Sequence, residues 1–348
     1  MSDLKGLLKK LSDAHGISGY EGNIGAIVKK EMKPYVDKIK VDSIGNLIGT
    51  KKGKGPSVMI AAHMDEIGLM AKYVDYNGFI SFVCVGGWFD QTLLSQRVVL
   101  YGKNGPVVGV VGSKPPHRMD ADERKKPIKT DDMFIDIGAK NREDAEKMGI
   151  FPGATATIDI EMKELTNNRV TGKAFDNRAG VVMMIEALKR MDTDATIYAV
   201  GTVQEEVGLK GAKTSAFGLD PDVAIATDVT IPGDHPGIEM KDAPVEMDNG
   251  PGVTVLDSSG RGIITPEPVL KWLCEAADKN KIPYQLDVSS GGTTDATAIF
   301  LTKSGIPTGV LSIPCRYIHS PVELLSLDDL DKSAELMAKA IDCVGDYF

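Results

Sequence analysis

The segment from Ile197 to Gly211, IYAVGTVQEEVGLKG, constrains the fold more than any other part of the chain. Its first half is an apolar, β-rich run that ends at Val203, and two adjacent carboxylates, Glu205 and Glu206, follow in a glycine-bounded turn. Neighbouring anions repel each other, so carboxylates at the end of a buried strand usually require a nearby cation or a raised pKa. A solvated acidic turn is the simpler explanation for an isolated Glu-Glu pair.

Four more candidate ligands occupy similar settings, which changes the balance between these two explanations. They are His63, Asp176, Asp228 and His319. His63 and Asp228 follow buried-type strands, and in open α/β sheets ligands collect at the carboxyl ends of such strands. Nitrogen and oxygen donors without a thiolate suit zinc, cobalt or manganese. Together with the Glu pair, these residues have the types expected of a two-metal hydrolase.

Asp176 has two possible explanations, and Asp65 has one candidate role. Asp176 opens a helical pattern, so an N-cap is the structural explanation, whereas the positive end of the helix dipole would equally favour a metal-bridging carboxylate. Asp65 lies two residues after His63, on the same side of an extended segment. It is therefore placed to accept the ring N–H of a metal-bound His63.

The order of the segments predicts a discontinuous catalytic domain and an insertion. Two helical patterns between Leu4 and Val36 precede strands that lead to His63. Residues 67–166 then show short strands with period-two alternation and glycine turns, which favours an inserted β-rich domain. The α/β rhythm returns after residue 166, so residues 1–66 and 167–348 are predicted to form one domain. The last helix is expected to begin with a capping box formed by Ser326 and Asp329.

Charge and hydropathy exclude several classes of function. With 49 acidic and 40 basic residues the formal net charge is −9, which argues against nucleic acid as a partner. No apolar run approaches the ~20 residues of a membrane span, and the amino terminus lacks the pattern of a signal peptide. The four cysteines have no paired spacing, so we expect reduced thiols in a cytoplasmic protein.

Six segments resemble the tetrahedral (TET) aminopeptidases, a family of co-catalytic metallopeptidases often catalogued as glutamyl or leucyl aminopeptidases and sometimes as endoglucanases. These segments are AAHMDEIGLM, GKAFDNRAG, VGTVQEEVGLKGA, ATDVT, SGGTTDA and RYIHSPVE. The resemblance covers essentially the whole chain, and no motif position departs from it. It implies a zinc-peptidase-like α/β/α sandwich with a mixed sheet, and a small PDZ-like β-barrel in the insertion that serves for dimerisation.

The resemblance also implies a role for each candidate residue. Two divalent metal ions per subunit, zinc or cobalt with manganese as a third candidate, would take their ligands from His63, Asp176, Glu206, Asp228 and His319. Asp176 would bridge the two ions, and the two histidines would be terminal ligands. Glu205 would be the general base and later the general acid, and Asp65 would orient His63. The implied reaction removes N-terminal residues from short peptides with a free amino terminus, through a metal-bridging water that Glu205 deprotonates.

The family further implies a homododecamer whose active sites face an internal chamber.

Three rival functions stay open on the sequence alone. A glycosidase (endoglucanase) would use two carboxylates roughly 5–9 Å apart without a metal, but it leaves the histidines without a role. A metal-dependent carboxypeptidase or N-acyl amino acid deacylase keeps the metals and changes the substrate. A scaffold without metals would act through assembly alone. Arg261 is a candidate for recognising an acidic substrate side chain, or for a structural salt bridge.

Overall fold

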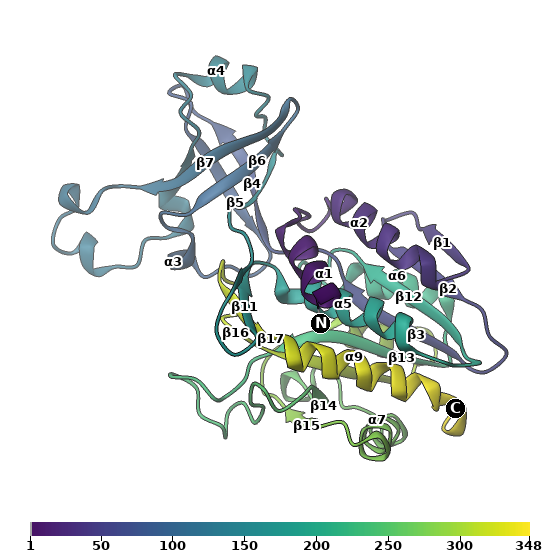
Figure 1. The fold of residues 1–348 in the computed structure, drawn as a ribbon. Helices are drawn as coiled ribbons and strands as arrows, with labels where there is room; N and C mark the ends of the chain where they lie inside the picture. The colour runs from purple at the N-terminus through teal and green to yellow at the C-terminus, as the bar shows by residue number, and fades with distance from the viewer. Residues whose placement is uncertain (1) are drawn as a thin grey trace.

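In a computed structural model that describes residues 2–348, eleven strands form one mixed sheet (Figure 1). The main path runs β1-β2-β12-β3-β13-β16-β17-β11-β10, and β14 and β15 continue from β16. The strands are β1 (Lys38–Val41), β2 (Leu47–Lys51), β3 (Ser57–His63), β10 (Lys163–Glu164), β11 (Arg169–Gly172), β12 (Thr196–Thr202), β13 (Val223–Thr230), β14 (Gly252–Leu256), β15 (Gln285–Val288), β16 (Thr308–Arg316) and β17 (Glu323–Ser326).

The centre of the sheet is parallel. Strands β12, β3, β13 and β16 lie side by side in this order, and all three neighbouring pairs are parallel. Strands covered on both faces read as nearly continuous apolar runs, as β3 does with SVMIAAH. Because the strands are parallel, their carboxyl ends meet at one edge of the sheet, which is where the predicted ligands follow in the sequence.

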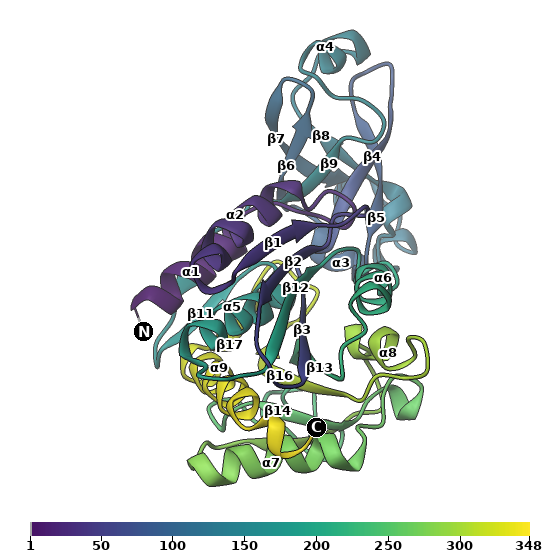
Figure 2. The ribbon, with the colours of Figure 1, turned by 90° about the vertical axis from the view of Figure 1, so that its right-hand side faces the viewer.

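Helices cover both faces of this sheet (Figure 2). The α-helices of the domain are α1 (Ser2–Asp13), α2 (Gly22–Met32), α5 (Phe175–Arg190), α6 (Lys210–Leu219), α7 (Glu267–Asn280), α8 (Asp295–Phe300) and α9 (Leu327–Asp342). Helix α5 packs on β3 and β13 and against α1 and α9, whereas α6 and α8 pack on the opposite face. Alternate residues of β3 serve the two cores: Ile60 belongs to the α5 side and Met59 to the α6 and α8 side. The predicted α/β/α sandwich is confirmed.

A closed six-stranded antiparallel barrel projects from the sandwich (Figure 1). Its strands follow the order β4-β5-β8-β7-β6-β9. They are β4 (Gly68–Val74), β5 (Ile80–Val85), β6 (Arg97–Gly102), β7 (Gly105–Ser113), β8 (Met133–Asp136) and β9 (Thr155–Ile158), with the short helices α3 (Asp90–Leu93) and α4 (Arg142–Lys147) between them. The barrel has a hydrophobic core of its own, which includes Leu69, Val98, Leu100 and Ile135.

One local prediction fails, and one helix was not predicted. Ser326 is the N-cap residue of α9 but makes no capping hydrogen bond with its side chain, and the Asp329 carboxylate instead accepts the backbone N–H groups of Asp248 and Gly250. The capping box is therefore wrong, because Asp329 anchors a distant loop. Helix α6 was not predicted, because its glycines, Gly211 and Gly218, lower helix propensity.

Two expectations concern membranes and thiols. No helix within residues 2–348 is long and apolar enough to cross a membrane. The four cysteines are free thiols.

Candidate metal centre

Residues from three parallel strands converge at the carboxyl edge of the sheet. His63 is the last residue of β3 and pairs in register with Thr202 of β12. Glu205 and Glu206 lie in the turn that follows β12. Asp228 lies near the carboxyl end of β13, in register with Ser312. This common edge explains why residues far apart in the sequence line one pocket.

Asp176 lies between the two histidines. Its Oδ1 is 3.1 Å from Nε2 of His63, and its Oδ2 is 3.3 Å from Nε2 of His319. Asp176 belongs to the first turn of α5 but has non-helical backbone angles (φ −76°, ψ 102°). Asn177 performs the capping role instead, since its Oδ1 accepts the N–H of Gly180 at 3.0 Å. The N-cap explanation for Asp176 is therefore wrong.

The side chains form three sets of atoms that could each hold one metal ion, with all ligand atoms of a set within 4.8 Å of one another. The sets are His63, Asp176 and Asp228; Asp176, Glu206 and His319; and His63, Glu205 and Glu206. The first two sets share only Asp176. A single carboxylate with one oxygen near each histidine is the arrangement expected of a bridging ligand.

The two adjacent glutamates face different histidines. Glu206 Oε2 lies 3.3 Å from Nε2 of His319, whereas Glu205 Oε2 lies 3.8 Å from Nε2 of His63. Asp65 lies behind His63: its backbone oxygen is 3.2 Å and its Oδ1 is 3.5 Å from His63 Nδ1. Ser18 donates a hydrogen bond of 2.6 Å to Asp65 Oδ2, which fixes that carboxylate in a buried position.

Burial and mutual repulsion dominate the electrostatics of the acidic residues. Burial and the neighbouring Asp176 raise the pKa of Asp228 well above its usual value, and they also raise the pKa of Glu206. Burial, together with Asp228, Asp295 and Glu206, raises the pKa of Glu205 well above its usual value against the opposing effect of His63.

For the two histidines, burial and the neighbouring carboxylates shift the pKa in opposite directions. Burial lowers the pKa of a histidine, but Asp176 and Glu206 outweigh it and raise the pKa of His319 to about 11. Burial likewise opposes charge on His63, but Glu205, Asp176 and Asp65 raise its pKa well above the usual value. The cluster therefore attracts positive charge.

The donor set fits divalent cations. The pocket that holds these residues has a volume of about 690 Å³, and no lysine or arginine of residues 2–348 lines it. Several buried carboxylates without a fixed cation are costly. Imidazole nitrogen and carboxylate oxygen, without a thiolate, are the ligands expected for zinc, cobalt or manganese.

Two buried carboxylates near the site had no predicted role. Glu323 of β17 accepts the backbone N–H of Asp176 at 3.0 Å and that of His319 at 3.1 Å. Asp295, at the start of α8, accepts a hydrogen bond of 2.5 Å from Thr202 Oγ1. Burial raises the pKa of Asp295 to about 6. Both residues lie in the quoted motifs RYIHSPVE and SGGTTDA, which was the only signal for them in the sequence.

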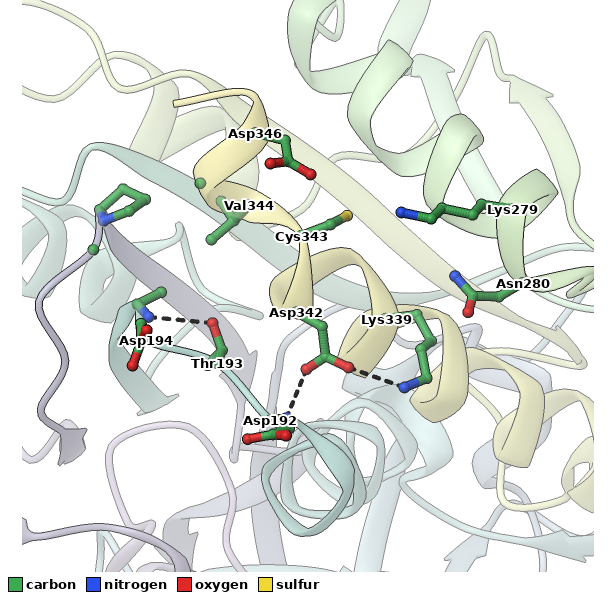
Figure 3. Close-up of a pocket in the computed structure, with 14 residues that line it drawn as sticks. Asp192, Thr193, Asp194, Lys279, Asn280, Lys339, Asp342, Cys343, Val344 and Asp346 are labelled. Atoms are coloured by element: carbon green, nitrogen blue, oxygen red, sulfur yellow. Dashed lines mark hydrogen bonds and ion pairs between the residues drawn. The ribbon is translucent and has the colours of Figure 1, made fainter.

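A second cavity, of about 480 Å³, lies at the opposite end of the parallel strands (Figure 3). It is lined by residues near the start of β3 and the end of α9, and it contains no histidine. The Asp342 carboxylate accepts hydrogen bonds from Lys339 Nζ and from the backbone N–H of Asp192. Its acidic groups are thus partly neutralised, unlike those of the candidate metal centre.

Comparison with known proteins identifies similar aminopeptidase sequences. A sequence model of the M42 glutamyl aminopeptidases matches residues 45–336. A putative aminopeptidase of Acetivibrio thermocellus is 44% identical over 340 residues, which are 97% of this chain and 98% of the relative. The lysyl aminopeptidase of Pyrococcus furiosus is 39% identical over 345 residues, with 96% of this chain and 95% of the relative covered.

Solved structures of two peptidases have the same fold over nearly the whole chain. An aminopeptidase from the archaeon Desulfurococcus kamchatkensis superposes with a TM-score of 0.94 at 45% identity, covering 98% of this chain and 95% of that protein. The TET1 peptidase of Pyrococcus horikoshii, described as assembling into a tetrahedron or a large octahedral shell, gives a TM-score of 0.86 at 34% identity, with 97% and 99% covered.

Proposed function

This chain belongs to the M42 glutamyl aminopeptidase family and is a peptide hydrolase, and we propose that it is a two-metal aminopeptidase that removes N-terminal residues from short peptides. The observation that carries the proposal is the position of Asp176, with one carboxylate oxygen near each of two histidines. A glycosidase has no use for this arrangement, and its carboxylate pair needs no histidine.

Five residues would hold two divalent cations, with zinc or cobalt as the first candidates and manganese as the third. His63, Asp176 and Asp228 would hold one ion, and Asp176, Glu206 and His319 would hold the other. The chemistry that such a pair supplies is Lewis-acid polarisation of the scissile carbonyl and a lower pKa for the attacking water. Histidine and carboxylate ligands bind metal ions in their deprotonated forms, so groups that hold a proton in the metal-free protein would lose it when the ions bind.

Glu205 remains as the general base. It is largely buried, it lies beside His63, and its pKa is raised by burial and by neighbouring carboxylates. A carboxylate with a raised pKa accepts a proton readily near neutral pH and can return it. In the proposed reaction Glu205 takes a proton from the attacking water and delivers it to the leaving amine, while Asp65 keeps the His63 ring in place.

The barrel and the assembly form a second part of the proposal. Residues 67–166 would be a dimerisation domain inserted into a catalytic domain of residues 1–66 and 167–348. Large apolar side chains are exposed on this segment, among them Tyr76 (78%), Phe89 (64%) and Val108 (59%). Exposed apolar groups of this kind are typical of protein interfaces. We propose a homododecamer, by analogy with the tetrahedral assembly of the Pyrococcus horikoshii relative, and light scattering on the purified protein tests it.

The activity is tested with free and N-acetylated aminoacyl anilides and a soluble cellulose. Each is assayed before and after EDTA treatment, and again after zinc or cobalt is added back. The proposal expects cleavage of the free-amine substrates only, lost with EDTA and restored by metal. Cleavage of the N-acetylated substrates alone would favour a deacylase, and chelator-insensitive sugar release without anilide cleavage would favour the glycosidase.

A further inference from the structure

The pocket of the candidate metal centre extends well beyond the proposed ligands. Its far wall is built by β13, β14 and β15, together with the loop that follows β14. Two carboxylates in this wall, Asp257 and Asp287, have no part in the proposed metal binding. Each residue is only 5% exposed, although both line the pocket. Buried charges are usually paired, so these two groups require an explanation.

Asp287 of β15 is linked to β13, the strand that carries the proposed ligand Asp228, through the side chain of Thr230. Thr230 follows Asp228 by two residues on β13, so both side chains point to the same face, about 6.6 Å apart along the strand. Thr230 Oγ1 donates a hydrogen bond of 2.8 Å to Asp287 Oδ2. This contact holds the Asp287 carboxylate in the pocket wall, next to the end of the strand that carries Asp228.

Asp257 supplies a carboxylate oxygen without a partner. Its Oδ1 accepts the backbone N–H of Ile263 at 2.5 Å, whereas its buried Oδ2 has no hydrogen-bond partner within residues 2–348. Gly262 makes the close approach of the chain to this carboxylate feasible, since a Cβ there would lie 1.9 Å from Oδ1. Burial raises the pKa of Asp257, and the charge of Asp287 raises it further. A cation placed between the two carboxylates would relieve both effects.

The remaining lining is partly apolar, and within residues 2–348 it contains no lysine or arginine to compensate the two carboxylates. Ile231, Ile238 and Ile318 supply apolar side chains, and serine and threonine hydroxyl groups supply polar ones. Arg261, considered above for an acidic substrate, is exposed, and its Nε donates to the backbone oxygen of Ser258. An acidic side chain would therefore meet no lysine or arginine among the described residues that line this pocket.

We propose that this pocket receives the side chain of a basic N-terminal residue, lysine or arginine, with its cationic end at Asp257 and Asp287. The inference rests on the proposed function and names the substrate class of that site. The aliphatic stem of lysine or arginine packs well on apolar side chains while its charged head makes polar contacts, which matches isoleucines followed by two carboxylates. Peptides that begin with lysine or arginine are the preferred substrates, and those that begin with glutamate or aspartate are the poorest.

The test compares lysyl, arginyl, leucyl and glutamyl anilides on the metal-loaded wild-type protein and on the variant Asp257→Asn/Asp287→Asn. We expect kcat/KM to be at least about ten-fold higher for the lysyl than for the leucyl substrate, and this ratio to fall by about 10- to 100-fold in the double variant, as for the loss of a hydrogen-bonded charge. The matched control is Asp346→Asn, which removes one charge from an exposed residue of the other cavity (Figure 3) and should keep the ratio.

A second measurement uses only the wild-type protein, so it stands even if the double variant fails to fold. Lysinamide should inhibit cleavage of the leucyl substrate at least about ten-fold more strongly than leucinamide does. Efficient cleavage with leucyl or glutamyl substrates preferred would overturn this inference and leave the proposed function intact. No cleavage of any free-amine substrate would overturn the proposed function and the inference with it. Three metal ions per chain, with one lost in the double variant, would also overturn the inference, because a cation would then occupy the two carboxylates.

Discussion

The backbone N–H of Glu205 donates a hydrogen bond of 3.1 Å to Oδ1 of Asp65. The other oxygen of the same carboxylate accepts the N–H of Glu206 at 3.2 Å. Asp65 therefore does more than orient the ring of His63, since it also fixes the backbone that carries both glutamates. This buried carboxylate therefore connects the end of β3, which carries the proposed ligand His63, to the turn after β12, which carries the proposed ligand Glu206.

Replacement of Asp65 by asparagine tests this connection. Asparagine has one acceptor oxygen in place of two, so it cannot serve both N–H groups. We expect Asp65→Asn to weaken metal binding by about 10- to 100-fold, as is usual for partners of metal ligands, and to lower kcat/KM at fixed metal concentration. Metal titration followed by the anilide assay measures both effects.

The control for this substitution is Ser18→Ala. It removes the hydrogen bond that Ser18 donates to Asp65 Oδ2 but leaves the carboxylate charge and both backbone contacts. Its effect should be clearly smaller. Metal affinity and kcat/KM equal to wild type in Asp65→Asn would mean that the carboxylate has no role in positioning either strand end.

Glu205→Gln distinguishes a general base from a metal ligand. Because Glu205 is proposed as the base, the variant should keep two metal ions per chain and lose about 10²- to 10⁴-fold in kcat. Glu206→Gln is the matched control, since the same change at a proposed ligand should cost metal content. Elemental analysis of both variants after dialysis reports the ions. Loss of metal from Glu205→Gln would assign Glu205 to the set that contains His63 and Glu206.

Asp176→Ala tests the bridge. A carboxylate shared by both ligand sets serves two ions, so its removal should empty at least one site and abolish activity. Asp228→Ala removes a ligand from a single set and should cost one ion at most. Counting bound metal in the two variants at equal protein concentration gives the comparison. An Asp176→Ala protein with two ions and full activity would rule out the two-metal assignment.

The local pattern of the sequence indicated several of the proposed ligands. His63, Glu206 and Asp228 each lie at or after the end of a strand that reads as apolar and buried, and parallel strands bring their carboxyl ends together. The strand order β12-β3-β13 could not be predicted from periodicity, because it depends on which strands pair across long stretches of chain. The resemblance to a known family supplied the missing step for the ligand set.

Contacts between distant segments explain what the sequence did not predict. Glu323 contacts Asp176 from 147 residues away, and no local pattern distinguishes it from a surface glutamate. Asp329 fits the capping-box pattern, but a more distant loop takes its carboxylate. The wall formed by Asp257 and Asp287 likewise arises only where β14 and β15 meet. In each case a local pattern competes with a tertiary contact, and the tertiary contact determines the position of the side chain.

The pH dependence of stability should differ between metal-free and metal-loaded protein. The raised pKa of His319, about 11 against an ordinary 6.5, stabilises the folded metal-free protein fully below pH 6.5, and this contribution is lost as pH rises towards 11. The raised pKa of Asp228 acts in the same direction, since the folded state then holds more protons than the unfolded state. The lowered pKa of Asp176 acts oppositely, but its contribution is complete above its ordinary value of 3.8.

Metal ions reverse this trend, because they bind deprotonated ligands and their stabilisation grows as pH rises. The difference in Tm between metal-loaded and EDTA-treated protein should therefore widen from about pH 6.5 to about pH 9. Thermal unfolding at three pH values measures it. His117→Asn, a change at an exposed histidine, should leave the difference unchanged. A difference that narrows with rising pH would contradict the proposed ligand set.

The buried ion cluster behind the site should carry stability. Lys173 Nζ donates to Glu66 Oε2 at 2.7 Å, and Arg178 Nη2 lies 3.4 Å from Glu66 Oε1, with all three side chains at most 7% exposed. Removing one partner of a buried ion pair typically costs about 3–5 kcal/mol, so Lys173→Met should lower the apparent free energy of unfolding by that amount in a urea titration at fixed metal concentration. Lys332→Met, which breaks the surface pair with Glu335, should change it by about 1 kcal/mol at most. Equal changes in the free energy of unfolding for the two substitutions would mean that the buried cluster contributes no more stability than a surface ion pair. The Coulomb attraction within the cluster would then only offset the cost of taking its three charged groups out of water.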